Sequence, residues 1–392
     1  MWIPRKYDNT LKALFAQFPA VAVTGARQVG KTALVRHAFP DVAYISLDFP
    51  AVAARAEQNP DGFFREHSLP LIIDEVQYAP SLFRYLKAII DADRKPGRLI
   101  LTGSQIFPLM EGISESLAGR CGALTVMNLA AAELRPFQGE STFNEAAFLF
   151  KGGYPELHAR PELDPHFWYG AYLTTYLERD VRNILNVGSL RDFDRFLRAV
   201  AARTGQILSY SDLARDVGVT PNTAKKWISV LQASGQVFLL EPFFRNIGKR
   251  LVKSPKLYLC DTGLAAFLMG FESWQAVERH PAVGALWETH VVMEVVKAFA
   301  SRGRNVPLWF WRTARGEEVD LIIERDGRIT AIECKYSEVV DESGLKGLRA
   351  FTADYGSEDV EARYVASRTS IPYPLTDGIT AIPGSRVADY LK

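Results

Sequence analysis

Short apolar runs alternate with amphipathic stretches over the first 140 residues. Residues 4–18 place Leu11, Leu14, Phe15 and Phe18 on one face of a predicted helix. Strands that alternate with helices form a parallel sheet with helices on both faces. We therefore expect an α/β fold, a doubly wound parallel sheet, over residues 1–140. Its predicted strands are 21–23, 42–48, 69–77 and 98–104, and helical stretches follow at 51–58 and 83–92.

The middle of the chain has a different pattern. Residues 141–194 are mostly helical in pattern and predict a small lid or linker, with no chemistry of its own. Residues 195–265 predict a winged helix-turn-helix: Tyr210 and Ser211 cap a first helix, and Gly218 makes the turn. Thr220 is a good N-cap for the second helix, and Pro221 suits its first position. Two strands, 237–241 and 256–260, are predicted to flank a basic hairpin at 245–253.

The predicted second helix carries polar side chains on its exposed N-terminal half. These are Asn222, Thr223, Lys225 and Lys226. In a DNA-reading winged helix the second helix enters the major groove and the wing contacts phosphates, so double-stranded DNA is one predicted partner. Winged helices attached to ATPases also bind protein, and this alternative stays open.

Residues 280–392 predict a further α/β domain. A helix over 284–299 precedes strands at 308–312, 317–323 and 329–336, and Asp326-Gly327 predicts a tight hairpin turn between the last two. Glu333 and Lys335 lie two apart in a strand, so both project to one face while Cys334 points to the core. Asp320 on the neighbouring strand and Glu288 on the helix are expected to join them.

Composition limits the classes of function. The 392 residues are 48% hydrophobic and 23% charged, with a net charge of +1, so any basic surface must be local. No apolar run reaches the length of a membrane span, and the N-terminus lacks a signal pattern. Three widely spaced cysteines predict neither a disulfide framework nor a zinc site. We expect a cytoplasmic protein that does not enter a membrane.

The segment 21–32, VAVTGARQVGKT, carries the strongest chemical signal. It is an apolar strand followed by Gly-x4-Gly-Lys-Thr and a helix, which is the spacing of a phosphate-binding loop. Glycines let consecutive N–H groups turn inward to an anion, and the helix dipole adds to the same pocket. Lys31 is expected to reach the β- and γ-phosphates of ATP, and the Thr32 hydroxyl to ligate Mg²⁺. The full predicted nucleotide-binding set is Gly25, Ala26, Arg27, Gln28, Val29, Gly30, Lys31, Thr32 and Ala33.

Two acids end the predicted strand at 69–77. In an open α/β sheet, ligands lie at the C-terminal ends of the strands. Asp74 is expected to hold Mg²⁺, and Glu75 to orient or deprotonate the attacking water. Thr102 and Ser104, at the tip of the next strand, are candidates for sensing the γ-phosphate. The alternative for these two is a turn that only caps the strand.

Arg120 lies in Leu-Ala-Gly-Arg near the end of the predicted ATPase domain. It is a candidate finger that neutralises charge in the transition state, in cis or in a neighbouring subunit of a homo-oligomer. An exposed arginine without such a role is the alternative.

Asp320, Glu333, Lys335 and Glu288 predict a second site. Carboxylates that converge with a lysine can hold Mg²⁺ and position a water, whereas the alternative is an ion-pair cluster on a solvated sheet face. Charged residues that interrupt otherwise apolar strands favour the metal-site architecture over this alternative.

Read together, these motifs resemble the AAA-type ATPases of bacteria and archaea that carry a C-terminal domain of unknown function. The marks are GARQVGKT, LIIDEVQ, LILTGS, LAGR, GGYPE and EVDLII…AIECK, and they cover nearly the whole chain. The last domain resembles the PD-(D/E)xK nuclease fold, which implies a restriction-endonuclease-like domain. In that fold Glu288, Asp320, Glu333 and Lys335 correspond to the acidic helix residue, the metal aspartate, the second acid and the lysine. The resemblance implies an ATPase with ATP and Mg²⁺ as cofactors. It leaves two hypotheses: a DNA-processing or defence enzyme, or a nucleotide-switched binding protein with an inactive nuclease-like module.

Overall fold

The computed structural model describes residues 1–104, 117–140, 142–176, 190–244, 254–304 and 307–391. The chain divides into two compact units. Unit 1 is Met1–Leu129 with Ala233–Gly235 and Phe299–Arg304, and unit 2 is Ala130–Gln232, Gln236–Ala298 and Asn305–Lys392. The segments predicted at 141–194, 195–265 and 280–392 therefore belong to one compact unit, apart from the short pieces assigned to unit 1.

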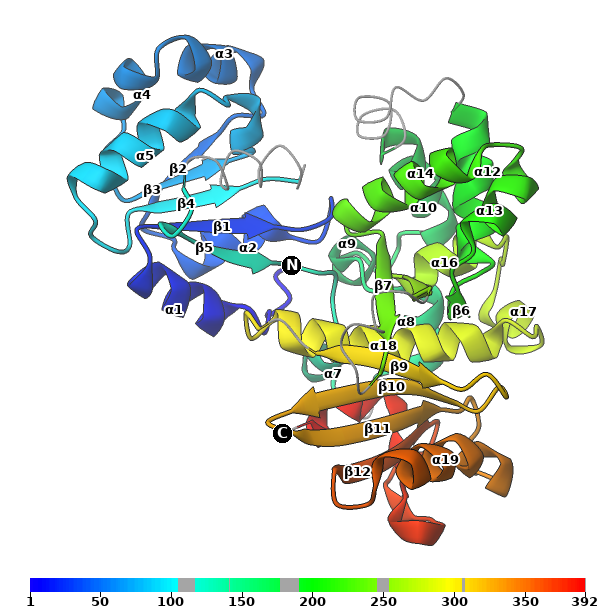
Figure 1. The fold of residues 1–392 in the computed structure, drawn as a ribbon. Coiled ribbons are helices and arrows are strands. Elements are labelled where there is room, and N and C mark those ends of the chain that lie inside the picture. The colour runs from blue at the N-terminus through cyan, green and yellow to red at the C-terminus, as the bar shows by residue number, and fades with distance from the viewer. Residues whose placement is uncertain (105–116, 141, 177–189, 245–253, 305–306, 392) are drawn as a thin grey trace. The chain divides into compact units, whose positions relative to one another are not determined.

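Unit 1 is built on a five-stranded parallel sheet in the order β2-β3-β4-β1-β5 (Figure 1). This order brings the C-terminal ends of β1, β3 and β4 together. The elements are α1 Asp8–Gln17, β1 Ala20–Thr24, α2 Lys31–Ala38, β2 Ala43–Ser46, α3 Pro50–Gln58, α4 Pro60–Glu66, β3 Leu71–Asp74, η1 Val76–Tyr78, α5 Leu82–Ala92, β4 Leu99–Thr102 and β5 Cys121–Thr125.

The central strands β1, β3 and β4 of this sheet are buried on both faces, as their apolar sequences predict. Alternate strand residues such as Ala22, Ile73 and Leu101 pack against side chains of α3, α4 and α5 in one core cluster. Helices α1 and α2 contact strands of the same sheet and each other. The predicted doubly wound sheet is therefore confirmed, and α1 is shorter than the predicted helix over 4–18.

Unit 2 contains a nine-stranded sheet in the order β13-β14-β12-β11-β10-β9-β7-β8-β6. Its strands are β6 Gln206–Ile207, β7 Val237–Pro242, β8 Lys256–Leu259, β9 Leu308–Arg312, β10 Glu318–Arg325, β11 Arg328–Cys334, β12 Val360–Ser367, β13 Tyr373–Pro374 and β14 Thr380–Pro383. Its helices are α7 Ala131–Gln138, α8 Glu145–Lys151, α9 Pro155–Ala159, α10 Pro165–Tyr176, α12 Leu190–Ala201, α13 Tyr210–Val217, α14 Pro221–Ala233, α16 Thr262–Leu268, α17 Trp274–Glu278, α18 Val283–Ala300, η3 Glu342–Leu345, α19 Lys346–Tyr355, η4 Thr376–Gly378 and η5 Gly384–Tyr390.

One strand pairing explains why the predicted third and fourth segments share a sheet. β7 pairs with β8 on one side and runs parallel to β9 on the other, with Glu241 opposite Trp309. A sequence pattern predicts that a segment forms a strand but not which distant strand it pairs with. One sheet therefore continues across the predicted division at 265–280.

The segment 190–259 has the order helix, short strand, two helices and two strands. Ser209 caps α13 by accepting a hydrogen bond from the Asp212 N–H, so the helix begins earlier than predicted, and Ser211 is not its cap. Thr220 accepts from the Thr223 N–H at 3.1 Å, which confirms the predicted N-cap. The buried Trp227 ring packs edge-on against rings from α12. The predicted basic hairpin at 245–253 lies outside the described residues.

The glycine pair Gly152-Gly153 packs against Asp261 in the helical part of unit 2. Asp261 caps α16 and accepts hydrogen bonds from the Gly153 N–H and the Tyr169 hydroxyl, each at 2.7 Å. A Cβ on Gly152 would lie 2.2 Å from an Asp261 carboxylate oxygen, so glycine is required there. The motif GGYPE, which had no chemical interpretation from sequence, therefore has a packing role.

Candidate nucleotide site and a buried charge cluster

The loop between β1 and α2 has the backbone that its glycines predict. Gly25 has a φ of 142°, and a Cβ there would lie 2.0 Å from the Val126 carbonyl oxygen at the end of β5. Gly30 adopts the left-handed region as the N-cap of α2. Gln28 also has a positive φ, 62°, and its side chain is exposed. Such left-handed steps turn successive N–H groups toward one concave side.

Lys31 is the first residue of α2 and is buried. Its ammonium donates to the carbonyl oxygens of Gly25 at 3.1 Å and Ala26 at 2.9 Å. The side chain therefore folds back over the loop, where a phosphate at the helix N-terminus would meet it. The loop residues Ala26 and Val29 are buried, Arg27 is half-buried, and Ala33 is exposed on the helix.

Asp74 lies at the centre of a hydrogen-bonded set of hydroxyl groups. Thr32 Oγ1 donates to Asp74 Oδ1 at 3.0 Å, and the Thr102 hydroxyl donates to the same oxygen. The Tyr44 hydroxyl on β2 donates to Asp74 Oδ2 at 2.7 Å. Burial, together with the hydrogen bond to and the charge of Asp74, raises the pKa of Tyr44 to about 12. The sequence-predicted Thr32, Asp74 and Thr102 thus converge, and Tyr44 is a residue that the sequence analysis missed.

Glu75 follows β3 in the left-handed region, with a φ of 56°. Its Oε2 accepts hydrogen bonds from the Ser104 N–H at 3.1 Å, the Ser104 hydroxyl at 3.0 Å and the Gln77 amide. Burial raises the pKa of Glu75, but these donors and the Lys31 ammonium outweigh it and lower the pKa below its ordinary value. A backbone strained at this point is typical of functional sites. Ser104 therefore contacts the predicted base, and Thr102 the predicted metal aspartate.

The donor chemistry of this edge fits a magnesium-bound nucleoside triphosphate. A hydroxyl and a carboxylate in mutual contact, Thr32 and Asp74, are the oxygen ligands that Mg²⁺ takes in phosphate-loop proteins. The loop before α2 supplies N–H groups for the phosphates, and the buried Lys31 supplies the positive charge.

The N-terminal segment supports the loop between β1 and α2 through a contact that no sequence motif predicted. The buried Arg5 donates to the Val29 carbonyl at 2.8 Å and to the Met127 carbonyl at 2.6 Å. The Met127 N–H in turn donates to the Tyr7 hydroxyl. One guanidinium therefore ties the phosphate loop to the segment after β5.

Arg120 is not part of this edge. It precedes β5, and because β5 runs parallel to β1, it lies at the end of the sheet opposite the phosphate loop. Its guanidinium makes a two-point ion pair with Asp91, at 2.7 and 2.9 Å. The placement in the structure does not support the predicted finger in cis, and a role in trans stays a prediction.

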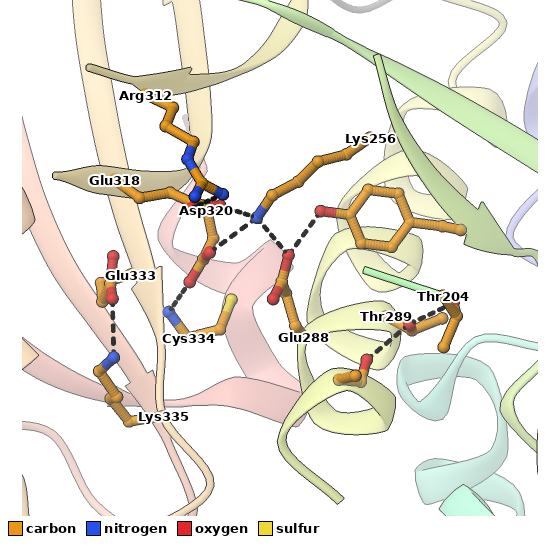
Figure 2. A network of polar contacts seen from close by, with 12 residues as sticks. Thr204, Lys256, Glu288, Thr289, Arg312, Glu318, Asp320, Glu333, Cys334 and Lys335 are labelled. Carbon is orange, nitrogen blue, oxygen red and sulfur yellow. Dashed lines mark hydrogen bonds and ion pairs between the residues drawn. The ribbon is translucent and has the colours of Figure 1, made fainter. Parts of the chain in front are cut away.

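Two of the four predicted nuclease-like residues, Glu288 and Asp320, meet in unit 2 at Lys256, a lysine that the sequence analysis did not single out (Figure 2). Lys256 Nζ, from β8, lies 2.8 Å from Glu288 Oε1 and 3.1 Å from Asp320 Oδ1, and it also pairs with Glu318. We call Lys256, Glu288, Glu318 and Asp320 the Lys256 cluster. The available signal was a lysine opening an otherwise apolar strand, KLYL.

Glu333 and Lys335 form a pair beside this cluster. Lys335 Nζ lies 2.8 Å from Glu333 Oε1, so the two side chains share a face as predicted. The Cys334 N–H between them donates to Asp320 Oδ2 at 2.8 Å. The register of the β9–β10 pairing shifts between Val319 and Ile322. Such irregularities change the direction of a side chain, and Asp320 lies within this one.

Burial and neighbouring charges perturb the acids of this region. Burial and the Asp320 carboxylate raise the pKa of Glu288 to about 7, although Lys256 opposes the shift. Burial, with Asp320, also raises the pKa of Glu333 well above its ordinary value. The Tyr258 hydroxyl donates to Glu288 Oε1 at 2.6 Å.

Three stretches of the chain match known family models. Residues 17–135 match the model of an AAA domain. Residues 144–275 and 283–387 match two domains of unknown function, DUF8612 and DUF4143. The N-terminal part is therefore an AAA-type ATPase domain. No described helix is both long and apolar enough to cross a membrane.

Among solved structures, the Walker-type ATPase PABY2304 of Pyrococcus abyssi is 17% identical, with a TM-score of 0.43 over 68% of this chain and 96% of that chain. The RuvB Holliday junction branch migration motor of Thermotoga maritima is 16% identical, with a TM-score of 0.30 over 60% of this chain and 89% of that chain.

Two curated relatives cover most of the chain. They are the uncharacterized proteins Rv2008c of Mycobacterium tuberculosis and Mb2031c of Mycobacterium bovis. Each is 31% identical over 382 residues, which are 96% of this chain and 82% of the relative. This chain therefore belongs to the family of these mycobacterial proteins, with an AAA domain ahead of two domains of unknown function.

Proposed function

We propose that this protein binds ATP with Mg²⁺ and hydrolyses it at the edge formed by β1, β3 and β4. The observation that carries this proposal is the contact of Thr32 and Thr102 with Asp74, beside a Glu75 that Ser104 and Gln77 hold in place. Three elements far apart in sequence thus present the groups that phosphoryl transfer to water requires.

Each residue has a distinct role in this proposal. The N–H groups of residues 25–32 and the Lys31 ammonium bind the phosphates, and Thr32 and Asp74 hold Mg²⁺, which neutralises phosphate charge when bound. Glu75, ionised at neutral pH, accepts a proton from water. Thr102 and Ser104 lie at the tip of β4, the strand between β3 and β1, and contact Asp74 and Glu75. From this position the two residues can sense the γ-phosphate.

Thr32→Val provides the test of the metal arrangement. Valine keeps the shape of threonine but lacks the hydroxyl, so we expect the Mg²⁺ concentration for half-maximal ATPase rate to rise about tenfold, the effect of losing one ligand worth ~1.4 kcal/mol. Phosphate release would be measured over a MgCl₂ titration, with Thr10→Val as the matched control because Thr10 bonds to Ser301 instead. Absence of any Mg²⁺-dependent phosphate release from the unaltered protein would refute the proposal.

We further propose that nucleotide state controls binding of a partner through the winged-helix-like segment 190–259. The support is its order of elements and the exposure of Asn222, Lys225 and Lys226 on α14. Double-stranded DNA is the partner we propose, because a helix that exposes lysines suits the major groove and its phosphates.

Lys225→Glu/Lys226→Glu tests DNA as that partner. Reversing two charges is expected to weaken binding of double-stranded DNA about 100-fold and to flatten its dependence on salt. The measurement is fluorescence anisotropy at several NaCl concentrations, with Lys346→Glu on α19 as a control of equal charge change per site. Unaltered DNA affinity in the double variant would contradict a DNA role for α14.

We also propose a cytoplasmic location, with which the three free cysteines agree, and a homo-oligomer. Concentration dependence of the specific ATPase rate would reveal an active site completed by a neighbouring subunit, including a trans role for Arg120.

A further inference from the structure

The order of elements from α18 to β12 supports a restriction-endonuclease-like fold, and such a fold implies a divalent metal at Asp320 and Glu333. Hard divalent cations need several oxygen atoms that converge without a competing cation. Both Asp320 oxygens are already engaged, by Lys256 Nζ and by the Cys334 N–H. With the Lys256 ammonium in place, no three His, Cys, Asp or Glu side chains of the described ranges are grouped to hold a metal ion. Asp320 therefore does not fit the metal while Lys256 is in place, although Glu333 Oε2 is buried without a hydrogen-bond partner in the described structure.

An ammonium lies among these acids instead. Lys256 Nζ is within ion-pair distance of Glu288, Glu318 and Asp320, which come from α18 and β10 (Figure 2). Its position among three carboxylates would bring a divalent cation and the ammonium into direct repulsion.

The Lys256 side chain is held in this place by its surroundings. Its strand, β8, is paired on both sides, with Lys256 opposite Leu240 of β7 and Ile207 of β6. The side chain is only 3% exposed, and its Nζ lies 5.6 Å from the centre of the Phe310 ring. A surface lysine could turn into water when a metal arrives, whereas this buried lysine would have to repack against its neighbours.

We propose that Lys256 takes the place of a divalent cation, so that the Lys256 cluster is an internal ion-pair clamp between β8, α18 and β10 and does not take a metal. The nuclease-like module then serves binding rather than cutting, which favours the nucleotide-switched binding protein over the DNA-processing enzyme. This inference does not depend on ATP hydrolysis in unit 1.

Removal of the ammonium supplies a direct test. Lys256→Met keeps the aliphatic stem but leaves three carboxylates without their shared cation, and they should then accept a metal. In nucleotide-free protein, we expect Lys256→Met to gain one Mn²⁺ site and a rise in melting temperature of about 5 °C in millimolar MnCl₂. The additional change Asp320→Asn should abolish both gains. The unaltered protein should show no Mn²⁺ binding that depends on Asp320.

The readouts are electron paramagnetic resonance of free Mn²⁺ and thermal unfolding, each with and without Asp320→Asn. Mn²⁺ binding by the unaltered protein that Asp320→Asn removes would overturn the proposal. So would Mg²⁺-dependent cleavage of DNA or RNA that the same change removes, or a folded Lys256→Met that gains no Mn²⁺. If Lys256→Met alone does not fold, the double variant Lys256→Met/Glu288→Gln, which has one acid fewer, is tested for the same gain of a Mn²⁺ site. The Mn²⁺ measurement on the unaltered protein does not depend on either variant.

Discussion

Glu75→Gln is expected to lower the ATP turnover number about 1000-fold while ATP affinity changes by less than about threefold. General-base catalysis contributes typically 10²–10⁴-fold, and glutamine cannot accept the proton of the attacking water. Glutamine is close in shape to glutamate, and its carbonyl oxygen can still accept from the Ser104 and Gln77 donors. The loss should therefore fall on the turnover number and not on binding.

The hydrogen bonds to Glu75 also determine how the rate depends on pH. Because its pKa lies below the ordinary glutamate value, the carboxylate stays ionised as the pH falls through that ordinary value, and the acid limb of the rate should lie below it. The rate is lost only as the pH falls through the lowered pKa. In Ser104→Ala one donor to the carboxylate is gone, so the acid limb should move to higher pH.

Turnover and affinity are separated by measuring phosphate release under single-turnover conditions and by titrating a fluorescent ATP analogue. Glu66→Gln is the matched control, since Glu66 is exposed and pairs only with Arg55 in the described structure. A turnover number in Glu75→Gln within tenfold of the unaltered protein would show that another group takes the proton.

The nucleotide site could be predicted from sequence because its chemistry is local. Gly25 to Thr32 form one continuous loop, and Asp74 and Glu75 end an apolar strand, so spacing alone assigns them. The parallel pairing of β1, β3 and β4 then brings these segments to one edge, as the alternation of strands and helices implies.

Residues that reach a site from a distant element gave no such signal. Arg5 binds the phosphate loop from a segment before α1, and Tyr44 reaches Asp74 from the neighbouring strand. Lys256 enters its cluster only because β7 pairs with both β8 and β9, a pairing across 68 residues of sequence between Glu241 and Trp309. The same pairing merged the predicted winged-helix and nuclease-like segments into one sheet. The pattern of residues along the chain does not predict which distant strands pair.

Lys31→Ala is expected to weaken ATP binding at least 100-fold, and it tests the loop independently of catalysis. The ammonium is buried at the N-terminus of α2 and is held 2.9 Å from the Ala26 carbonyl. A charge-assisted contact to phosphate in such a place is worth about 3 kcal/mol, which corresponds to a factor of more than 100 in affinity. Removal of the side chain leaves the loop N–H groups and the helix dipole, so weak binding should persist.

Titration with a fluorescent ATP analogue in the presence of Mg²⁺ measures this loss directly. Lys12→Ala is the matched control, because Lys12 is an exposed lysine on α1 that pairs with Asp8 at 2.7 Å. It should bind ATP as the unaltered protein does. Thermal unfolding without nucleotide establishes that both variants are folded, and added ATP should raise the melting temperature of Lys31→Ala less than that of Lys12→Ala. Equal ATP affinity in the two variants would contradict the assignment of residues 25–32 as a phosphate-binding loop. The Lys31 ammonium, which is buried and contacts this loop, would then contribute nothing to ATP binding.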